Sequence, residues 1–278
     1  MRNKQTIARE ITLSGKGIHS GSPIQMSLRP SSSGQITFIR SDLDGLEFRI
    51  EPETMAARNS TNLVRGEHRI LTIEHLMASL YAYAVDSVLI ELNGEEVPIL
   101  DGSSLPFAEA LADAGVRELD LPQETIYVRE AFSLEAGEAS IQVTPSDSLV
   151  ISYRIDFDHP AVGVQDFRLE LDPENFVSQI APARTFGFLK DVPRLWAERL
   201  ALGGSLENAL VLDDQKLING PLRFPDEFVR HKVLDLIGDL SILGRPVCGH
   251  FSADRAGHAL HLRSVRHLLQ HPHLWEAG

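Results

Sequence analysis

The sequence predicts an α+β protein built from two similar halves. The chain has 278 residues, a length that suits one large domain or two domains of about 120–150 residues. Each half shows the same order of patterns: several strands, a helix that carries a histidine, a further strand and a closing helix. We place the first half at residues 1–120 and the second at 125–278. A content of 43% hydrophobic and 23% charged residues is ordinary for a globular protein.

In the first half, alternating apolar and polar residues predict strands, two of them around a glycine-rich turn. The predicted strands lie within residues 11–21, 24–30, 36–40, 47–50 and 87–92. Apolar residues at helical spacing predict a helix over 74–83. A second helix is predicted over 105–114, with Gly115 as its C-cap. The stretch 119–123 is predicted to be a linker.

The second half repeats this plan, although no repeat is visible residue by residue. Strands are predicted over 125–132, 139–144, 149–157 and 247–251, and helices over 173–180, 228–243 and 264–270. If the halves face each other, the two histidine-bearing helices lie side by side. A functional site between the halves is then expected, because sites often lie at domain interfaces.

One segment of the second half departs from the plan. Residues 183–212 are apolar, contain several glycines and include Trp196. Two interpretations remain open for it. The segment is either plain core, or an inserted strand–helix–strand unit, at about 186–212, that lines a groove for an aliphatic ligand.

Charge and cysteine content exclude several classes of protein. The net charge of −13 leaves no basic surplus to neutralise phosphates, which argues against nucleic acid as a partner. The single cysteine, Cys248, permits neither an intrachain disulfide nor a cysteine-based zinc site, and we expect it in the core. The N-terminus lacks the apolar region of a signal peptide, and no run of about 18 apolar residues is present. We therefore expect a cytoplasmic protein without a transmembrane segment.

A polar stripe runs along the helix predicted over 228–243. His231, Asp235 and Asp239 follow each other at four-residue spacing, so they stand one turn apart on one face. Such groups are costly to bury unless something binds them. Zinc binds both imidazole and carboxylate, and catalytic zinc sites have three protein ligands. One helix turn supplies only two ligands, so a third must come from elsewhere. Alone, this spacing more often marks a surface pair or a cap contact.

Glu74 and His75 begin the predicted helix of the first half, after Thr72, a residue type that caps helices. Neighbouring residues on a helix point about 100° apart, so both cannot be ligands on one narrow face. A histidine ligand with a glutamate as general base is the usual arrangement of hydrolytic zinc sites. The alternative is an exposed Glu-His pair at a helix start.

A further histidine follows Gly257. The glycine predicts a tight turn into a strand, with His258 near its mouth, where it can protonate a leaving group as general acid. Four more histidines follow closely and are predicted to lie mostly at the surface: His261, His267, His271 and His273.

Taken in order, these motifs resemble the UDP-3-O-acyl-N-acetylglucosamine deacetylases, the zinc enzymes of the committed step of lipid A synthesis. The resemblance covers nearly the whole chain. It is carried by SGKGIHSG (14–21), TIEHL (72–76), VPILDGS (97–103), ARTFGF (183–188), LGGS (202–205), EFVRHKVLDLIGD (227–239) and GHAL (257–260). The chain departs from the family at His261, where asparagine is usual, and matches it only loosely over residues 58–63.

The resemblance implies a fold of two α+β domains, each a two-layer α/β sandwich with an insert, and helices packed between two sheets. It implies a site of three zinc ligands, His75, His231 and Asp235, with Glu74 as general base. It also implies His258 as a cationic general acid.

The same resemblance implies further roles around the metal. Asp239 would orient His258, Lys232 would supply positive charge, and Thr185 would help to hold the oxyanion. His19 lies in a matching glycine-rich turn near the site. The passage for the substrate's acyl chain would be lined from the insert, by Phe186, Leu200, Ala201, Gly204, Ala209 and Val211.

The implied activity is hydrolysis of the N-acetyl group of UDP-3-O-acyl-N-acetylglucosamine, giving acetate and a free amine, by a monomeric enzyme. Fe²⁺ suits the same ligands as Zn²⁺. One alternative is a zinc amidohydrolase for another acylated amino sugar, and a short-chain substrate would not need the apolar insert. Another is a non-catalytic metal- or lipid-binding protein, which would need neither Glu74 nor His258.

Overall fold

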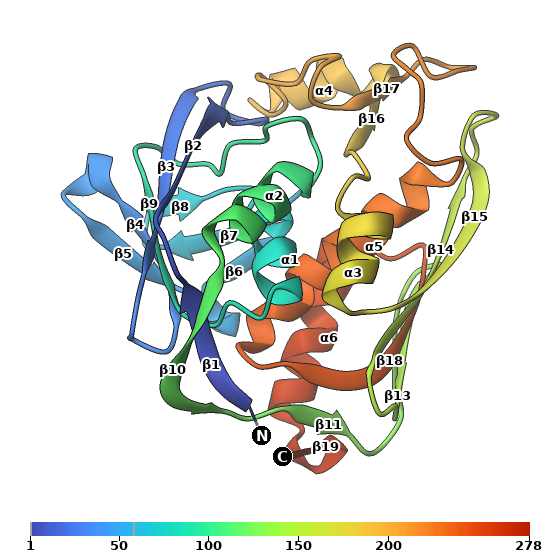
Figure 1. Cartoon of the computed structure of the whole chain (residues 1–278). Helices are drawn as coiled ribbons and strands as arrows, with labels where there is room; N and C mark the ends of the chain where they lie inside the picture. The colour runs from blue at the N-terminus through green and yellow to red at the C-terminus, as the bar shows by residue number, and fades with distance from the viewer. Residues whose placement is uncertain (1, 58) are drawn as a thin grey trace.

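Two sheets face each other across a layer of helices in the computed structural model, which describes residues 2–57 and 59–278 (Figure 1). The sheet of the first half lies at the left of Figure 1, in blue, and that of the second half lies at the right. Helices of both halves lie between them. The predicted α+β fold, with helices between two sheets, is confirmed.

The two large sheets have the same strand topology. In the first sheet, β9 (Val88–Leu92) is the central strand; it is antiparallel to β3 (Pro23–Pro30) and parallel to β4 (Ile36–Arg40). With β2 (Ile11–Lys16) and β5 (Leu46–Arg49) at the edges, the order is β2-β3-β9-β4-β5. In the second, β18 (Val247–Asp254) has the same place among β12 (Phe132–Ala136), β13 (Ala139–Thr144), β14 (Leu149–Phe157) and β15 (Gly163–Glu170). The matching plans seen in the sequence therefore correspond to matching topologies.

Each central strand is flanked in the chain by two helices. These are α1 (Glu74–Ala82) and α2 (Leu105–Ala114) around β9, and α5 (Glu227–Leu240) and α6 (His258–Gln270) around β18. Gly115 ends α2 with a positive φ of 69°, as predicted for a glycine C-cap. Helices α1 and α5 are buried along almost their whole length, because a sheet covers each side of the helix layer.

Each half also carries an insert between its last edge strand and its first buried helix. In the first half this is the sheet of β6 (Met55–Ala57), β7 (Thr61–Arg65) and β8 (His68–Ile70). In the second it is β16 (Phe186–Phe188), α4 (Val192–Ala197) and β17 (Leu210–Leu212), with the two strands parallel. The segment around Trp196 thus contains a strand, a helix and a strand, as one of the two interpretations expected; its role in binding an aliphatic ligand stays a prediction.

Short elements complete the fold. The chain starts with β1 (Arg2–Ile7), which pairs with β10 (Val116–Gln123). In the second half, β11 (Ile126–Val128) and β19 (Trp275–Ala277) extend the large sheet, and α3 (Pro173–Asn175) continues into a π-helical turn (Phe176–Ile180). The prediction of a linker at 119–123 is wrong, because these residues belong to β10. Strand β10 shows little alternation of apolar and polar residues, because it forms only a two-stranded ribbon with β1.

The prediction that Gly257 leads into a strand is also wrong. Gly257, with an extended φ of −152°, precedes the first residue of α6, and its carbonyl accepts hydrogen bonds from the amides of Leu260 and His261. His261 is fully buried rather than at the surface. Its place, three residues into an amphipathic helix, puts it on the face that packs inward.

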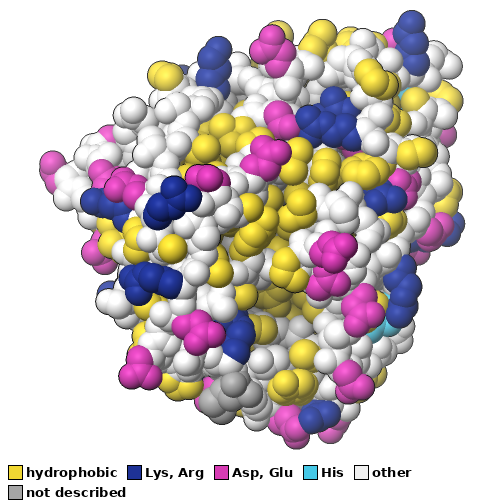
Figure 2. Space-filling view, viewed as in Figure 1, with side chains coloured by type: hydrophobic (Ala, Val, Ile, Leu, Met, Phe, Trp, Pro, Cys, Tyr) yellow, Lys and Arg dark blue, Asp and Glu magenta, His cyan; other side chains and the backbone are white. Residues whose placement is uncertain are grey.

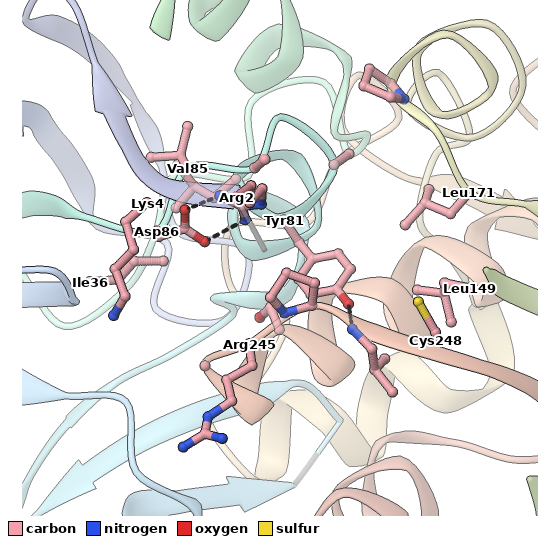
Figure 3. A pocket seen from close by; sticks show the side chains of 18 of the residues that line it. Arg2, Lys4, Ile36, Tyr81, Val85, Asp86, Leu149, Leu171, Arg245 and Cys248 are labelled. Atoms are coloured by element: carbon pink, nitrogen blue, oxygen red, sulfur yellow. Dashed lines mark hydrogen bonds and ion pairs between the residues drawn. The ribbon is translucent and has the colours of Figure 1, made fainter. Parts of the chain in front are cut away.

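Cys248 lies not in the closed core but on the wall of a cavity of about 590 Å³ at the C-terminal end of α1 (Figure 3). In this cavity Arg2 binds Asp86 through two hydrogen bonds of 2.6 and 2.8 Å, and Tyr81 Oη accepts one of 3.0 Å from the amide of Val247. On the face drawn in Figure 2, hydrophobic side chains form a band down the middle, with charged side chains scattered on both sides. The acidic charge is therefore spread over this face rather than gathered in one patch.

Candidate metal centre and active site

Three buried ligand-type side chains converge where α1 meets α5. His75 comes from the first turn of α1, and His231 and Asp235 from successive turns of α5. Asp235 Oδ1 lies 3.4 Å from His231 Nε2 and 3.8 Å from His75 Nε2, and the two imidazole rings are 5.0 Å apart. The structure thus brings together the three residues predicted as metal ligands.

The donor set fits a divalent cation. With ligands about 2.0–2.2 Å from a tetrahedral metal, two donor atoms lie about 3.3–3.6 Å apart, close to the separations of Asp235 Oδ1 from the two imidazoles. Asp235 Oδ1 is buried and has no hydrogen-bond partner among the described residues. An unpartnered buried carboxylate oxygen costs free energy unless a cation binds it.

The protonation states fit a metal as well. Burial lowers the pKa of His75 to about 3, helped by the neighbouring His231, so its imidazole is neutral. Burial alone would raise the pKa of Asp235, but Lys232 and His231 hold it well below its usual range. Neutral imidazoles and an ionised carboxylate are the forms that bind metals.

Two contacts fix this arrangement. His231 Nδ1 lies 3.1 Å from the carbonyl oxygen of Ala183, which leaves Nε2 facing the cluster. Lys232 Nζ donates a hydrogen bond of 2.7 Å to Asp235 Oδ2, the oxygen that does not face the imidazoles. Although burial lowers the pKa of Lys232, the Asp235 carboxylate raises it overall. The lysine is therefore cationic beside the cluster.

Glu74 lies next to the cluster but outside it. Burial raises its pKa to about 8, despite the opposing effect of His258. Its Oε2 accepts a hydrogen bond of 3.0 Å from the amide of Thr61, and its Oε1 lies 3.9 Å from His258 Nε2. A carboxylate with a raised pKa is suited to accept a proton and hold it.

His258 faces Glu74 from the first turn of α6. Its Nδ1 donates to Asp239 Oδ2 at 2.8 Å, so Nε2 points toward the cluster, 3.8 Å from Asp235 Oδ2. Burial lowers the pKa of this imidazole, but Asp239 and Asp235 outweigh burial and raise it to about 9. His258 is therefore a cation at neutral pH, able to donate a proton.

A glycine allows the two helices to approach. At Gly238 of α5, an added Cβ would lie 2.2 Å from the carbonyl oxygen of Glu74. The chain before Glu74 also bends sharply, since Thr72 has a left-handed φ of 58°. The position of Glu74 and His75 against α5 thus depends on backbone contact rather than on side-chain packing.

The cluster opens into a cavity of about 850 Å³ that runs along the insert. Glu74, His75, Lys232 and His258 line its inner end. Most of the residues predicted to contact substrate line it too: His19, Thr185, Phe186, Ala201, Gly204, Ala209 and Val211. The prediction is wrong for Leu200, which follows α4 and is not among the residues that line the cavity.

A buried glutamate that the sequence analysis missed holds the turn of His19. Glu96 is fully buried and accepts hydrogen bonds from the amides of His19 and Ser20, at 2.8 and 2.7 Å, and from the hydroxyl of Thr72, at 2.9 Å. His19 Nδ1 in turn accepts a 3.3 Å hydrogen bond from the amide of Ala201 in the insert. The motif containing Val97 was visible, but nothing in the sequence linked the preceding glutamate to the glycine-rich turn.

Two further residues around Asp239 were also missed. The Thr61 hydroxyl donates to Asp239 Oδ1, and His261 Nδ1 lies 2.7 Å from Asp239 Oδ2, so this carboxylate is shared by three side chains. Thr61 belongs to the stretch 58–63 that matched the family loosely, and Arg58 of that stretch lies outside the described residues. The one feature of the sequence that could have indicated the role of His261 was that it stands where the family usually has asparagine.

Comparison with known proteins gives a consistent result. The family model described as UDP-3-O-acyl N-acetylglycosamine deacetylase matches residues 4–270. A protein of Campylobacter lari named UDP-3-O-acyl-N-acetylglucosamine deacetylase is 42% identical over 99% of this chain and 94% of its own length. Proteins with the same name from Myxococcus xanthus and Oleidesulfovibrio alaskensis are 44% and 41% identical, over 99% and 98% of this chain and 88% and 91% of their own lengths. Among the described residues, no helix is long and apolar enough to cross a membrane.

Proposed function

The chain belongs to the UDP-3-O-acyl N-acetylglycosamine deacetylase family, and from that membership we propose a mechanism for its own residues. The enzyme is a metal-dependent hydrolase that removes the acetyl group from UDP-3-O-acyl-N-acetylglucosamine in lipid A biosynthesis. The observation that supports this assignment best is the set of buried acid, base and ligand-type side chains at the inner end of an apolar cavity.

His75, His231 and Asp235 would hold the metal, and we propose zinc because two imidazoles and one carboxylate form a typical catalytic zinc set. Iron(II) is the second candidate, since it suits the same ligands. When bound, the metal supplies a Lewis acid that polarises the acetyl carbonyl and makes water more acidic.

The protein's own groups manage the protons. Glu74 takes a proton from the attacking water as the water oxygen bonds to the carbonyl carbon. Thr185 and Lys232 line the cavity, and we assign their hydroxyl and ammonium groups to stabilise the negative charge that develops on the carbonyl oxygen. His258 gives its Nε2 proton to the departing nitrogen as the C–N bond breaks. Acetate and the free amine of the glucosamine result.

The residues that line the cavity support a proposal for the rest of the substrate. We place the acyl chain along the apolar wall formed by Phe186, Ala209 and Val211 of the insert. His19, in its turn held by Glu96, faces the same space and is a contact for the polar part of the substrate. We further propose that the enzyme acts as a monomer, because the proposed ligands, base and acid all come from one chain. The cytoplasmic location stays an expectation from the sequence.

One experiment tests both metal and activity. Purified protein is analysed for bound zinc and iron, and acetate release is measured with UDP-3-O-acyl-N-acetylglucosamine and with UDP-N-acetylglucosamine, which lacks the acyl chain. We expect about one metal ion per chain and a strong preference for the acylated sugar. Equal rates on both sugars would refute the assigned acyl path and favour an amidohydrolase of another amino sugar. A metal-free, fully active protein would refute the metal site.

A further inference from the structure

Large apolar side chains that face solvent are concentrated on the insert of the second half. Among the described residues, eight large hydrophobic side chains are exposed, and five of them lie between residues 189 and 218. We call these five the apolar rim: Leu189, Trp196, Leu202, Leu206 and Ile218. Trp196 is 60% exposed and Leu206 57%; exposed apolar side chains are common singly, but their concentration in one segment is typical of an interaction surface.

The apolar rim surrounds the outer end of the cavity that holds the candidate active site. Leu189, Trp196, Leu206 and Ile218 line the same cavity that Glu74, His75 and His258 line at its inner end. Helix α4 and strands β16 and β17, which carry or border the rim, stand at one end of the molecule, at the top of Figure 1. The exposed apolar surface is therefore continuous with the apolar passage and borders its mouth.

We propose that the apolar rim binds to the surface of a phospholipid bilayer, so that the mouth of the passage opens directly onto lipid. Only the reason for this membrane contact rests on the proposed function. A substrate with a long acyl chain could then move from the lipid into the passage without exposing its chain to water. The surface itself is defined by exposure and by continuity with the cavity. Tryptophan beside leucine and isoleucine is the typical composition of a surface that inserts shallowly at a membrane interface.

Charge indicates which lipid surface is preferred. Residues 189–218 contain four basic and five acidic side chains, a net charge of −1, and the whole chain carries −13. Attraction to anionic headgroups therefore does not drive the contact. Burial of apolar area does, so we expect binding to zwitterionic phosphatidylcholine vesicles to be at least as strong as to vesicles rich in phosphatidylglycerol. Added salt should not weaken it.

The first test is co-sedimentation with phosphatidylcholine vesicles. Replacing two rim residues, in the double variant Leu202→Ser/Leu206→Ser, should lower vesicle affinity by about tenfold or more, because each side chain loses most of its contact with lipid. The matched control, Val116→Ser/Val164→Ser, removes exposed apolar side chains elsewhere, 41% and 49% exposed, and should bind like the unmodified protein. Should the double variant fail to fold, the single variant Leu202→Ser, whose side chain does not line the cavity, gives the same comparison.

The second test reads Trp196 directly. The chain has two tryptophans, so a Trp275→Phe background leaves Trp196 as the only one. Vesicles should then shift its emission to shorter wavelength, as the ring leaves water. No binding to vesicles, an equal loss in the valine control, or a concentration-dependent dimer that buries Trp196 without lipid would each overturn the proposal.

Failure of the proposed function would look different. Vesicle binding needs no catalysis, so Glu74→Gln should bind vesicles like the unmodified enzyme. If acetate release fails while vesicle binding depends on the rim, the reaction assignment is wrong and the membrane contact stands. If acetate release succeeds and the rim variants bind vesicles normally, only the membrane contact is wrong.

Discussion

At the residue scale, the site separates two buried carboxylates by their surroundings. Asp235 has a cationic lysine and two imidazoles beside it, which keep it ionised. Glu74 lacks such close cationic contacts apart from His258, and burial raises its pKa to about 8. The first is therefore suited to hold a cation permanently, and the second to gain and lose a proton within a catalytic cycle.

The variant Glu74→Gln should keep its metal and lose most of its rate. Glutamine has the same shape and preserves the contact with the Thr61 amide, but it cannot take a proton. Loss of a general base typically costs about 10²–10⁴-fold. Metal content and acetate release, measured on the same preparation, test this. The control is Glu91→Gln, at a partly exposed position on β9, and near-normal turnover of Glu74→Gln would assign the base elsewhere.

The variant Asp239→Asn should move the basic limb of the pH–rate profile to lower pH. With His258 as the proposed acid in its protonated form, activity should fall as the pH rises through its pKa, here raised to about 9. Asp239 is a main cause of that raised pKa, and its loss lowers the pKa. Glu74 and Asp235, the other acids that face the ring, stay in place. The control is Asp147→Asn, in the separate cavity that Cys248 lines, and it should leave the limb unmoved. An unmoved limb in Asp239→Asn would mean that another group is the acid.

At the element scale, the site depends on how closely α1 and α5 approach and on where the insert lies. The helices meet at the backbone of Glu74 and Gly238. The insert is joined to the site by β16, which begins one residue after Thr185. Changes at these junctions should alter the site without replacing any of its side chains.

Gly238→Ala should lower both stability and metal content. The new methyl group would meet the carbonyl of Glu74 at 2.2 Å, so α1 must move away from α5. Overpacking of this kind costs about 1–3 kcal/mol, and it separates His75 from His231 and Asp235. Thermal unfolding and metal analysis measure the two effects. Gly257→Ala, where an added Cβ meets nothing within 4 Å, is the control, and equal metal content in both variants would contradict this account.

Val211→Trp should shorten the acyl chain that the enzyme accepts. Val211 lies on β17, an extended strand that tolerates a large side chain, and it lines the passage. We choose it over Ala201, which also lines the passage, because the left-handed φ of 54° at Ala201 would add strain to a larger residue. Each buried methylene contributes about 0.8 kcal/mol, so blocking the passage should weaken long-chain substrates far more than short-chain ones. KM values for a series of chain lengths test this. A uniform loss across the series would place the acyl chain elsewhere.

Elements with strong internal patterns could be predicted, and those fixed by neighbours could not. The strands β4, β13 and β14 and the helix α2 match their predicted ranges because alternation or helical spacing marks them. Strands β1 and β15 are polar and lie at sheet margins, so periodicity does not reveal them. Likewise, the spacing of His231 and Asp235 predicts a shared face, whereas the approach of Thr61 to Asp239 depends on the folded chain. The division at residues 120 and 125 stays a prediction.

At the scale of the whole molecule, the candidate metal ligands come from both halves of the fold. His75 belongs to the helix pair of the first half, and His231 and Asp235 belong to that of the second. A cation bound by all three adds a cross-link between the two helix pairs in the native state only. Binding energy of this kind adds to stability through linkage.

Removal of the metal should therefore lower the unfolding temperature. At a free metal concentration 100-fold above its dissociation constant, binding stabilises the native state by about 2.7 kcal/mol. A chelator should lower the Tm of the unmodified protein by several degrees. It should have little effect on His75→Ala, His231→Ala or Asp235→Ala, each of which should contain less metal. Full metal occupancy in all three variants would refute the ligand assignment.

The contact between the insert and the glycine-rich turn has a consequence for how this sequence can change over time. At Gly203 an added Cβ would lie 2.1 Å from the carbonyl oxygen of Gly17 and 2.9 Å from the Cα of Gly21, and the amide of Gly203 donates to the carbonyl of Ile18 at 3.0 Å. Two segments about 180 residues apart in the chain thus touch backbone to backbone. A side chain at Gly203 would require the turn to withdraw, and an added Cβ at Gly21 would in return lie 3.2 Å from the backbone of Leu202 in the insert. Descendants of this gene should therefore keep Gly21 and Gly203 together or lose them together, and the pairing of these two positions across lineages would record the contact.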